Sequence, residues 1–195
     1  MIMAMKTIVK HILLLSILSV AAACSYREYA PSDYPSPQVY LPAALVSDAI
    51  WTIDGTPLPI NYAGKDNKSF YDISEDGRKL EVHLGVVASG IERGHYLVKL
   101  SYAHSRINYL REDGSLPIDV LPLPEGACSL PESVVIDAPD VAAPFDLKIS
   151  LSYLKDPEFI GKRFAVGVRI ACEDAEVTEE LENVIILIDP AFLHE

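Results

Sequence analysis

The segment that comes nearest to a metal-binding loop runs from Asp72 to Gly77. Its order, Asp-Ile-Ser-Glu-Asp-Gly, places side-chain oxygens at the first, third and fifth positions and glycine at the sixth, as in an EF-hand calcium loop. Such a loop needs a bidentate glutamate at its twelfth position, and that position is His83. The flanking residues alternate as strands do. We therefore interpret the segment as a polar hairpin turn and expect no metal and no cofactor.

The histidines, serines and carboxylates form no recognisable catalytic motif. His83, His95, His104 and His194 lack both the H-E-x-x-H order and the spacing of zinc ligands, and the chain contains no G-x-S-x-G sequence. His83 falls on the polar side of an alternating segment, where we expect it to be solvated. Some pair among the many carboxylates could lie at glycosidase distance, but their abundance gives that pairing little weight. No phosphate-binding or dinucleotide-binding glycine motif is present, so we expect no catalytic residue and no enzyme.

Cys24 is the one residue for which the sequence predicts a specific covalent fate. It follows Ala21-Ala22-Ala23 and an apolar run over residues 12–20, with Lys6 and Lys10 ahead of that run. A positive flank, a short apolar core and small residues describe a secretory signal. A cysteine directly after the small residues is typical of the bacterial lipobox, although Ala21 stands where leucine is usual. We expect cleavage after residue 23 and acylation of Cys24; the alternative is an ordinary cleavage site.

The other two cysteines, Cys128 and Cys172, allow two interpretations. An even number of cysteines in an exported chain favours a disulfide. The alternative is two separate buried thiols, which behave as small apolar side chains. Sequence separation does not show whether their strands are neighbours, so both interpretations stay open.

Aromatic side chains supply the remaining candidate ligand contacts. Trp51 precedes the Asp54-Gly55 turn, and Tyr62, Phe70 and Tyr71 flank a loop over residues 64–69. Exposed Trp and Tyr rings can stack on sugars because they combine flat apolar area with a polar tip. If the two loops share one end of the domain, these four residues could form a glycan platform. Ordinary core packing is the alternative.

The charge of the chain argues against one class of partner. The chain has 16 basic and 28 acidic residues, and segment 1–23 carries two of the basic ones and none of the acidic ones. Removal of that segment leaves fourteen basic and twenty-eight acidic residues, a net charge of −14. Nucleic-acid binding rests on Lys and Arg that neutralise phosphates, so we expect no such partner. Contact with anionic headgroups is also disfavoured, and we expect the lipid on Cys24 to provide the membrane attachment.

Strands must position these residues. Residues 24–38 hold Pro31, Pro35 and Pro37 and are interpreted as a tether, and residues 39–195 as one domain. Turn signals occur at residues 54–55, 76–77 and 113–114, and short helical turns are possible near residues 106–110 and 178–181. Period-two alternation or continuous apolar character predicts strands over residues 80–84, 98–102, 145–153, 164–170 and 184–188. Short strands with recurring turns predict an all-β, antiparallel sandwich.

Several short motifs together carry a family likeness. They are Val39-Tyr40-Leu41-Pro42, residues 81–86, Asn108-Tyr109, residues 123–126 with Ser129-Leu130, and Val134-Val135-Ile136. In this order they resemble the Bacteroidetes lipoprotein domain of unknown function that also occurs at the N-terminus of some endo-β-N-acetylglucosaminidases. The chain departs from that pattern at Ala127-Cys128 and at residues 163–166. The resemblance implies an immunoglobulin-like sandwich among glycan-use proteins and carries over no catalytic residue.

These expectations favour a binding module on the outer membrane, which holds a glycan or protein for uptake or adhesion. The alternative is a structural subunit of a surface fibre, for which 172 mature residues are few. An exposed aromatic patch would favour the first, and a groove with a detachable edge strand the second. Ser25-Tyr26-Arg27-Glu28 has no dense acidic cluster, which leaves the cell surface and the periplasmic face both open.

Overall fold

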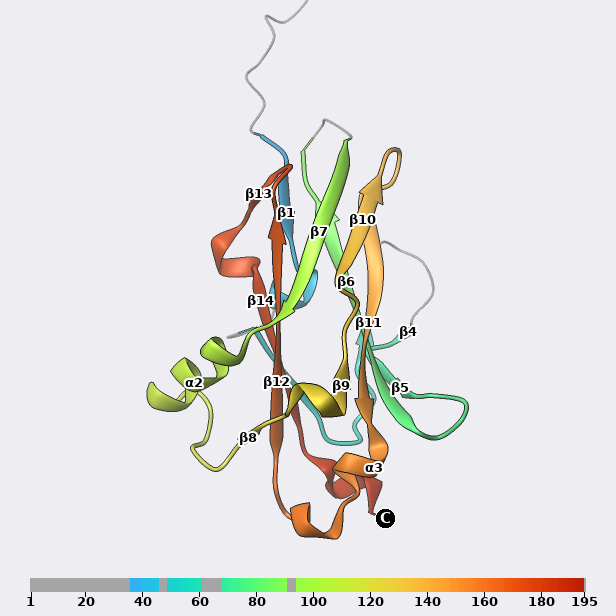
Figure 1. Cartoon of the computed structure of the whole chain (residues 1–195), viewed down its shortest axis with the longest axis vertical. Coiled ribbons are helices and arrows are strands. Elements are labelled where there is room, and N and C mark those ends of the chain that lie inside the picture. The colour runs from blue at the N-terminus through green and yellow to red at the C-terminus, as the bar shows by residue number, and fades with distance from the viewer. Residues whose placement is uncertain (1–35, 46–48, 61–67, 91–93, 195) are drawn as a thin grey trace, which may run out of the picture. The chain divides into compact units, whose positions relative to one another are not determined.

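The computed structural model of the chain describes residues 36–45, 49–60, 68–90 and 94–194 (Figure 1). Segment 1–23, Cys24 and Tyr62 lie outside the described residues. The residues described belong to one compact unit. In these ranges no helix has both the length and the apolar character needed to cross a membrane.

The described strands form two six-stranded sheets and one two-stranded ribbon. The first sheet has the order β13–β1–β6–β11–β9, with β5 also paired to β6. Its strands are β1 (Gln38–Tyr40), β5 (Tyr71–Ile73), β6 (Lys79–Ala88), β9 (Cys128–Ser129), β11 (Ala142–Ser150) and β13 (Glu176–Val177).

The second sheet has the order β10–β7–β12–β14–β2, with β8 also paired to β12. Its strands are β2 (Ile50–Ile53), β7 (His95–Tyr102), β8 (Leu121–Pro122), β10 (Ser133–Asp137), β12 (Phe164–Cys172) and β14 (Asn183–Ile188). The ribbon consists of β3 (Pro59–Ile60) and β4 (Lys68–Ser69).

The long strands pair antiparallel, as predicted. In the pair β6–β11, the register runs from Lys79 opposite Ser150 to Val87 opposite Ala142. Three short pairs are parallel: β1 with β13, β8 with β12, and β2 with β14. Along the chain, β1 in the first sheet is followed by the short helix η1 (Pro42–Leu45) and then by β2 in the second sheet.

Alternation along the strands places the main core between the two sheets. Leu80, Val82 and Leu84 of β6 are at most 1% exposed and lie in one cluster with Val166 and Val168 of β12. The predicted all-β sandwich is therefore confirmed. Each sheet buries one face against the other, and the burial of these apolar side chains holds the two sheets together.

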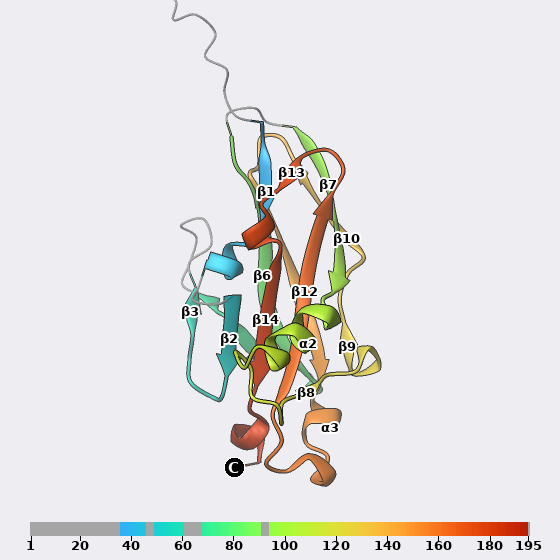
Figure 2. The same ribbon diagram turned by 90° about the vertical axis from the view of Figure 1, so that its left-hand side faces the viewer.

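A second, smaller core lies on the outer face of the second sheet. There α2 (His104–Glu112) lies against β12 and β14 (Figures 1 and 2). The cluster consists of Ile107, Leu110, Leu116, Val120, Ala165, Ile185 and Leu187. Because α2 covers this face, β14 is buried on both sides, which explains its continuous apolar sequence. The turn predicted near residues 106–110 is thus a nine-residue helix.

Gly167 of β12 allows the segment before α2 to reach the sheet. A Cβ atom at this position would lie 2.9 Å from the Cβ atom of Ala103 and 2.9 Å from its carbonyl oxygen. The Ala103 amide donates a 2.8 Å hydrogen bond to the Gly167 carbonyl. Only glycine leaves room for this approach.

The strand predicted over residues 145–153 ends earlier than expected. β11 stops at Ser150, and α3 (Leu151–Leu154) follows it. Leu151 and Leu154 are 3% and 0% exposed, because a spacing of three residues directs both to the same side of a helix. Tyr153, predicted to point inward from a strand, is half-buried on α3.

The other short helices are of the 3-10 type. One of them occupies the turn predicted near residues 178–181. They are η3 (Glu125–Ala127), η4 (Pro157–Phe159), η5 (Glu179–Leu181) and η6 (Pro190–Leu193). The predicted turns are confirmed at Gly55, Gly77 and Gly114, where φ is 92°, 66° and 85°.

Candidate functional site

The aromatic residues near β2 and β5 serve mainly to close one edge of the sandwich. Trp51 stacks on Phe70, with ring centroids 4.3 Å apart and planes inclined by 23°. The Trp51 Nε1 atom donates a 2.7 Å hydrogen bond to the carbonyl of Ala43. Phe70 is 0% exposed, so the prediction that it stacks on a sugar is wrong. Phe70 directly precedes β5 and belongs to the core cluster between the sheets, which leaves no face for a ligand.

Tyr71 is also engaged within the domain. Its hydroxyl donates a 2.9 Å hydrogen bond to the carbonyl of Thr56, and its ring is tilted against Phe192 at 6.2 Å. Burial, with a smaller effect of Asp54, raises the pKa of Tyr71. Trp51 and Tyr71 are half-buried, so each could offer a sugar only part of a ring whose polar atom is already bonded.

Cys128 and Cys172 are free cysteines that lie in different sheets. Cys128 lies opposite Ile149 in the first sheet, and Cys172 lies opposite Val98 in the second. The disulfide that the cysteine count allowed is therefore not formed in the structure, and the alternative of two separate half-buried thiols is observed. Burial, helped by Glu125, raises the pKa of Cys128 to about 12. At neutral pH the group is a thiol and not a nucleophilic thiolate.

The calcium-like segment forms the predicted polar hairpin turn between β5 and β6. Asp76 accepts hydrogen bonds from the Ser74 hydroxyl at 2.7 Å and from the Arg78 amide at 3.0 Å. These bonds hold the pKa of Asp76 below its usual value. The carboxylate of Asp76 thus accepts its hydrogen bonds from within the turn. In the described part of the chain, no group of three His, Cys, Asp or Glu residues is arranged to hold a metal.

His83 is not solvated as predicted, because two carboxylates enclose its ring. Its Nδ1 atom lies 2.8 Å from Asp146 Oδ1, and its Nε2 atom lies 3.1 Å from Asp72 Oδ2. The three residues come from the adjacent strands β11, β6 and β5, on the outer face of the first sheet. They are separated by 63 and 11 positions in sequence, so no local motif could reveal the arrangement.

A pocket of about 650 Å³ opens at one end of this outer face. It lies where the β5–β6 hairpin, β9 and the start of α3 meet. The lining residues are Gly77, Arg78, Lys79, Gly126, Ala127, Cys128, Ser129, Lys148, Ser150, Leu151, Ser152 and Lys155. The end of the β6–β11 ladder brings the parts together: Lys79 lies opposite Ser150, and the Leu151 amide donates a 2.9 Å hydrogen bond to the Arg78 carbonyl.

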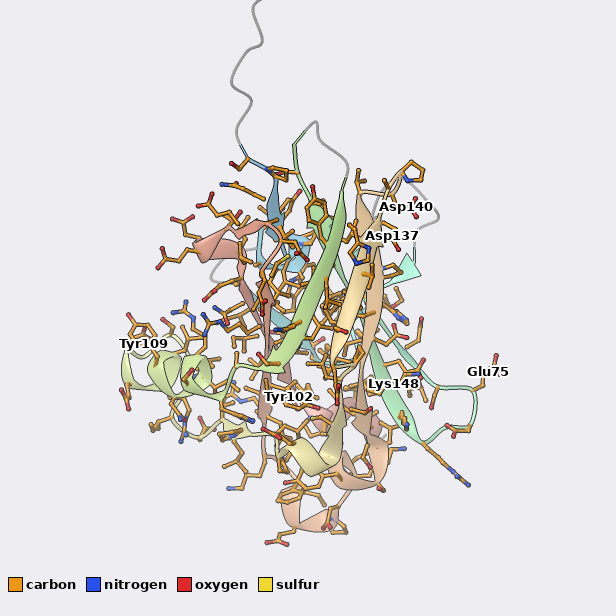
Figure 3. The ribbon with its side chains drawn as sticks, turned by 45° about the horizontal axis from the view of Figure 1, so that its top comes forward. Glu75, Tyr102, Tyr109, Asp137, Asp140 and Lys148 are labelled. Atoms are coloured by element: carbon orange, nitrogen blue, oxygen red, sulfur yellow. The ribbon has the colours of Figure 1, made fainter. Side chains whose placement is uncertain are left out.

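The charge of this cationic pocket is opposite to that of the chain. Four of the sixteen Lys and Arg residues line it, and none of its twelve described lining residues is Asp or Glu. Lys148 lies on β11 between Ser129 of β9 and Glu81 of β6 (Figure 3). Its Nζ atom donates a 2.9 Å hydrogen bond to Glu81, which raises the pKa of Lys148.

The other three pocket cations are Arg78, Lys79 and Lys155, and they differ from Lys148 in their pairing. None of their side chains takes part in a salt bridge with the described residues. Hydroxyl groups complete the lining, and the oxygens of Ser150 and Ser152 lie 2.8 Å apart. The site therefore offers positive charge and hydrogen-bonding groups together. No sequence pattern predicts this pocket, because three well-separated segments contribute to it and no motif joins them.

No family model matches this chain, and no curated protein matches it. Solved structures do resemble it. A "putative carbohydrate binding protein" from Bacteroides ovatus ATCC 8483 has a TM-score of 0.54 at 12% identity, over 78% of this chain and 36% of its own. A multidomain protein including DUF1735, also from Bacteroides ovatus, has a TM-score of 0.52 at 14% identity, over 79% and 45% of the two chains.

The third similar structure is EndoBT-3987 of Bacteroides thetaiotamicron, in complex with a Man5GlcNAc product. Its TM-score is 0.51 at 10% identity, over 77% of this chain and 30% of its own. The fold of this chain thus occurs within part of each of these Bacteroides proteins. The fold that the resemblance implied is thereby confirmed. This chain spans between about a third and just under half of the length of the three proteins.

Proposed function

We propose that the chain is a lipid-anchored, non-catalytic domain that binds carbohydrate at the cationic pocket. The observation that carries this proposal is the pocket itself, whose free cations and serine hydroxyls match the many oxygen atoms of a sugar. The shared fold adds support, since one structure of this fold bears the name "putative carbohydrate binding protein".

The proposal of a non-catalytic role rests on the state of the reactive groups in the pocket. Cys128 is held as a thiol by its raised pKa, and the nearby carboxylate of Glu81 is paired with Lys148. Asp72 and Asp146 are both engaged with His83. No Asp or Glu is among the described residues that line the pocket, so the lining offers no carboxylate pair of the kind that glycoside hydrolysis uses.

The proposal of an anchor rests on Cys24 and the segment before it. Acylation at this position would attach the domain to the outer membrane, on its surface or its periplasmic face. The tether would then hold the domain away from the headgroups, which a domain of net charge −14 has no reason to approach.

Glycan retention by the mature chain tests the proposal. Affinity gels that contain neutral or acidic polysaccharides, together with a glycan array, should show retention on at least one carbohydrate. An Arg78→Gln change should weaken that retention, because Arg78 lines the pocket and has no salt-bridge partner in the described part of the chain. Absence of retention on every neutral and acidic glycan would contradict the proposal.

A further inference from the structure

The cationic pocket is an exception to the charge of the whole domain. In a chain with 28 acidic and 16 basic residues, its lining holds four cations and, among the described residues, no carboxylate. A cleft lined by one sign of charge concentrates ligands of the opposite sign. An anion that approaches this negatively charged domain would therefore be attracted only where such cations gather, as they do in the pocket lining.

The carboxylates near the pocket offset part of the positive charge of its lining. Glu81 accepts a hydrogen bond from Lys148 and so neutralises one of the four lining cations. Asp76 lies close enough to Arg78 and Lys79 for their charges to lower its pKa, but it is bonded to its own turn. Glu125 lies on the other side, near Cys128. Arg78, Lys79 and Lys155 therefore line the pocket without a salt bridge among the described residues, while Asp76, Glu125 and Asp156, the last next to Lys155 in the chain, offset part of their charge.

The three cations differ in what they can recognise. Arg78 presents a planar guanidinium fork that fits two oxygens of one oxyanion, whereas Lys79 and Lys155 act as point charges. The hydroxyls of Ser129, Ser150 and Ser152 can exchange hydrogen bonds with sugar hydroxyls, and Leu151 adds a small apolar surface. No aromatic ring is among the described lining residues. Affinity for an uncharged sugar would therefore lack the stacking on which many sugar sites depend.

The position of the pocket separates it from the point where the chain enters the domain. β1 pairs with Val87 and Ala88 at the end of β6, whereas Lys79 lies at its beginning. At about 3.3 Å per residue, these two ends of β6 lie about 30 Å apart. Figure 1 shows the same separation, with β1 beginning at the upper end and α3 near the lower end. The pocket therefore lies at the end of β6 that is distant from β1.

We propose that the pocket is specific for acidic carbohydrate, and that Arg78, Lys79 and Lys155 bind the carboxylate of a uronic acid or a sulfate ester on the sugar. This inference rests on the proposed function and names the ligand class of the same site. Binding would depend on charge, so it should weaken steeply with salt.

Affinity electrophoresis and calorimetry of the mature chain test the inference. The probes are polygalacturonate, chondroitin sulfate, neutral dextran and vesicles of phosphatidylglycerol, at about 20 and about 300 mM NaCl. The test variant is Arg78→Gln/Lys79→Gln/Lys155→Gln. The matched control, Lys99→Gln/Lys162→Gln/Arg163→Gln, removes the same charge outside the pocket lining. Circular dichroism melts establish that both variants are folded.

We expect binding to polygalacturonate or to chondroitin sulfate, with the better of the two identifying the carboxylate or the sulfate. The test variant should bind about tenfold more weakly or worse, and the control within about twofold of the wild type. Equal loss in both variants, or tighter binding to the vesicles, would overturn the inference. Binding to dextran that is tighter than binding to either acidic polymer, and that the test variant loses, would overturn the inference and leave the proposed function standing. Dextran binding that the test variant retains would overturn both, because the proposed function places binding at the same cations. Failure of all three glycan probes would overturn the inference, and the glycan array would then decide the proposed function.

Discussion

Cys128 shows how the surroundings of one residue decide its chemistry. It lines a pocket of polar and cationic residues, where a thiolate would be stabilised by the positive charge. Burial of the thiol and the carboxylate of Glu125 nevertheless raise its pKa to about 12. The pocket is therefore suited to holding a ligand by hydrogen bonds and charge, and not to covalent chemistry on sulfur.

We expect slow alkylation of Cys128 in the folded protein. Its pKa of about 12, against 9.0 for an unperturbed thiol, lowers the thiolate fraction at pH 8 about 10³-fold. Iodoacetamide labelling of residues 25–195 carrying Cys172→Ser, followed by mass spectrometry, measures the rate at Cys128 alone. The same variant in urea is the control. Equal rates in the folded and unfolded protein would contradict the expectation.

For Cys24 we expect that a Cys24→Ser change abolishes acylation, because serine lacks the thiol that would receive the lipid. Metabolic labelling with an alkyne fatty acid should mark the wild-type chain and not the variant. The variant should also leave the membrane fraction, since the acyl chains would provide the proposed attachment. A Cys172→Ser chain is the control and should keep its label. Label that survives in the Cys24→Ser chain would refute the assignment.

Single residues also show what the sequence could and could not predict. The polar turn around Asp76 was predictable, because its Asp-Gly order and local hydrogen bonds lie within a few residues. The environment of His83 was not, since Asp72 and Asp146 reach it only through strand pairing. The burial of Phe70 was not predictable either. Phe70 precedes β5, and the pairing of β5 with β6 places its side chain in the core. A strand of three residues is too short for a periodic pattern to indicate its buried face.

At the scale of elements, three Asp-Gly turns share one construction. The carboxylates of Asp54, Asp76 and Asp113 accept a hydrogen bond from the amide two residues later, at 3.0, 3.0 and 2.9 Å. In each case hydrogen bonding holds the pKa below its usual value. A carboxyl group whose pKa is lower in the folded state stabilises the fold at neutral pH. That stabilisation is lost as the pH falls through the folded-state pKa.

We therefore expect these turns to contribute to acid unfolding below about pH 4. Asn can accept the same amide bond without a charge, so Asp54→Asn/Asp76→Asn/Asp113→Asn should stay folded at pH 7 and lose stability less steeply on acidification. Urea unfolding at pH 7, 4 and 3 measures the difference. Parallel pH profiles for the variant and the wild type would show that the turns do not contribute.

The contact between β12 and the segment before α2 gives a second test at this scale. Gly167→Ala should lower the free energy of unfolding by about 1–3 kcal/mol, because the added methyl group would overlap Ala103. The matched control is Gly126→Ala, where nothing lies within 4 Å of the added atom. The control should change stability by less than about 0.5 kcal/mol. Equal urea midpoints for the two variants would contradict this account of Gly167.

The long elements were predictable and the short ones were not. The period-two pattern predicted over residues 80–84, 98–102 and 164–170 lies within β6, β7 and β12, so the buried faces of these strands could be assigned from the sequence. Leu151 continues the apolar alternation of β11 but begins α3, because an apolar residue at this junction suits either a strand or a helix. The parallel partners of β1 and β2 arise from the path of the chain and leave no periodic signal.

At the scale of the whole molecule, sheet-on-sheet packing was predictable and the pocket was not. Turn spacing and alternation favoured a sandwich before any pairing was known. The pocket needs residues from the ends of β6 and β11, from β9 and from α3. Its position depends on how far each strand extends, which is the least predictable property of an element.

The short length of β1 bears on how the domain would behave under tension. An anchored domain that holds a large polymer at its far end carries a load along the direction of β6. That load would enter through three residues of β1, which pair with only two residues each of β6 and β13. Because these strands lie parallel or antiparallel to the pull, their hydrogen bonds would be sheared together and not opened one by one. We expect β1 to detach as the first mechanical event, while the β6–β11 pair that forms the pocket stays intact and lengthens the tether.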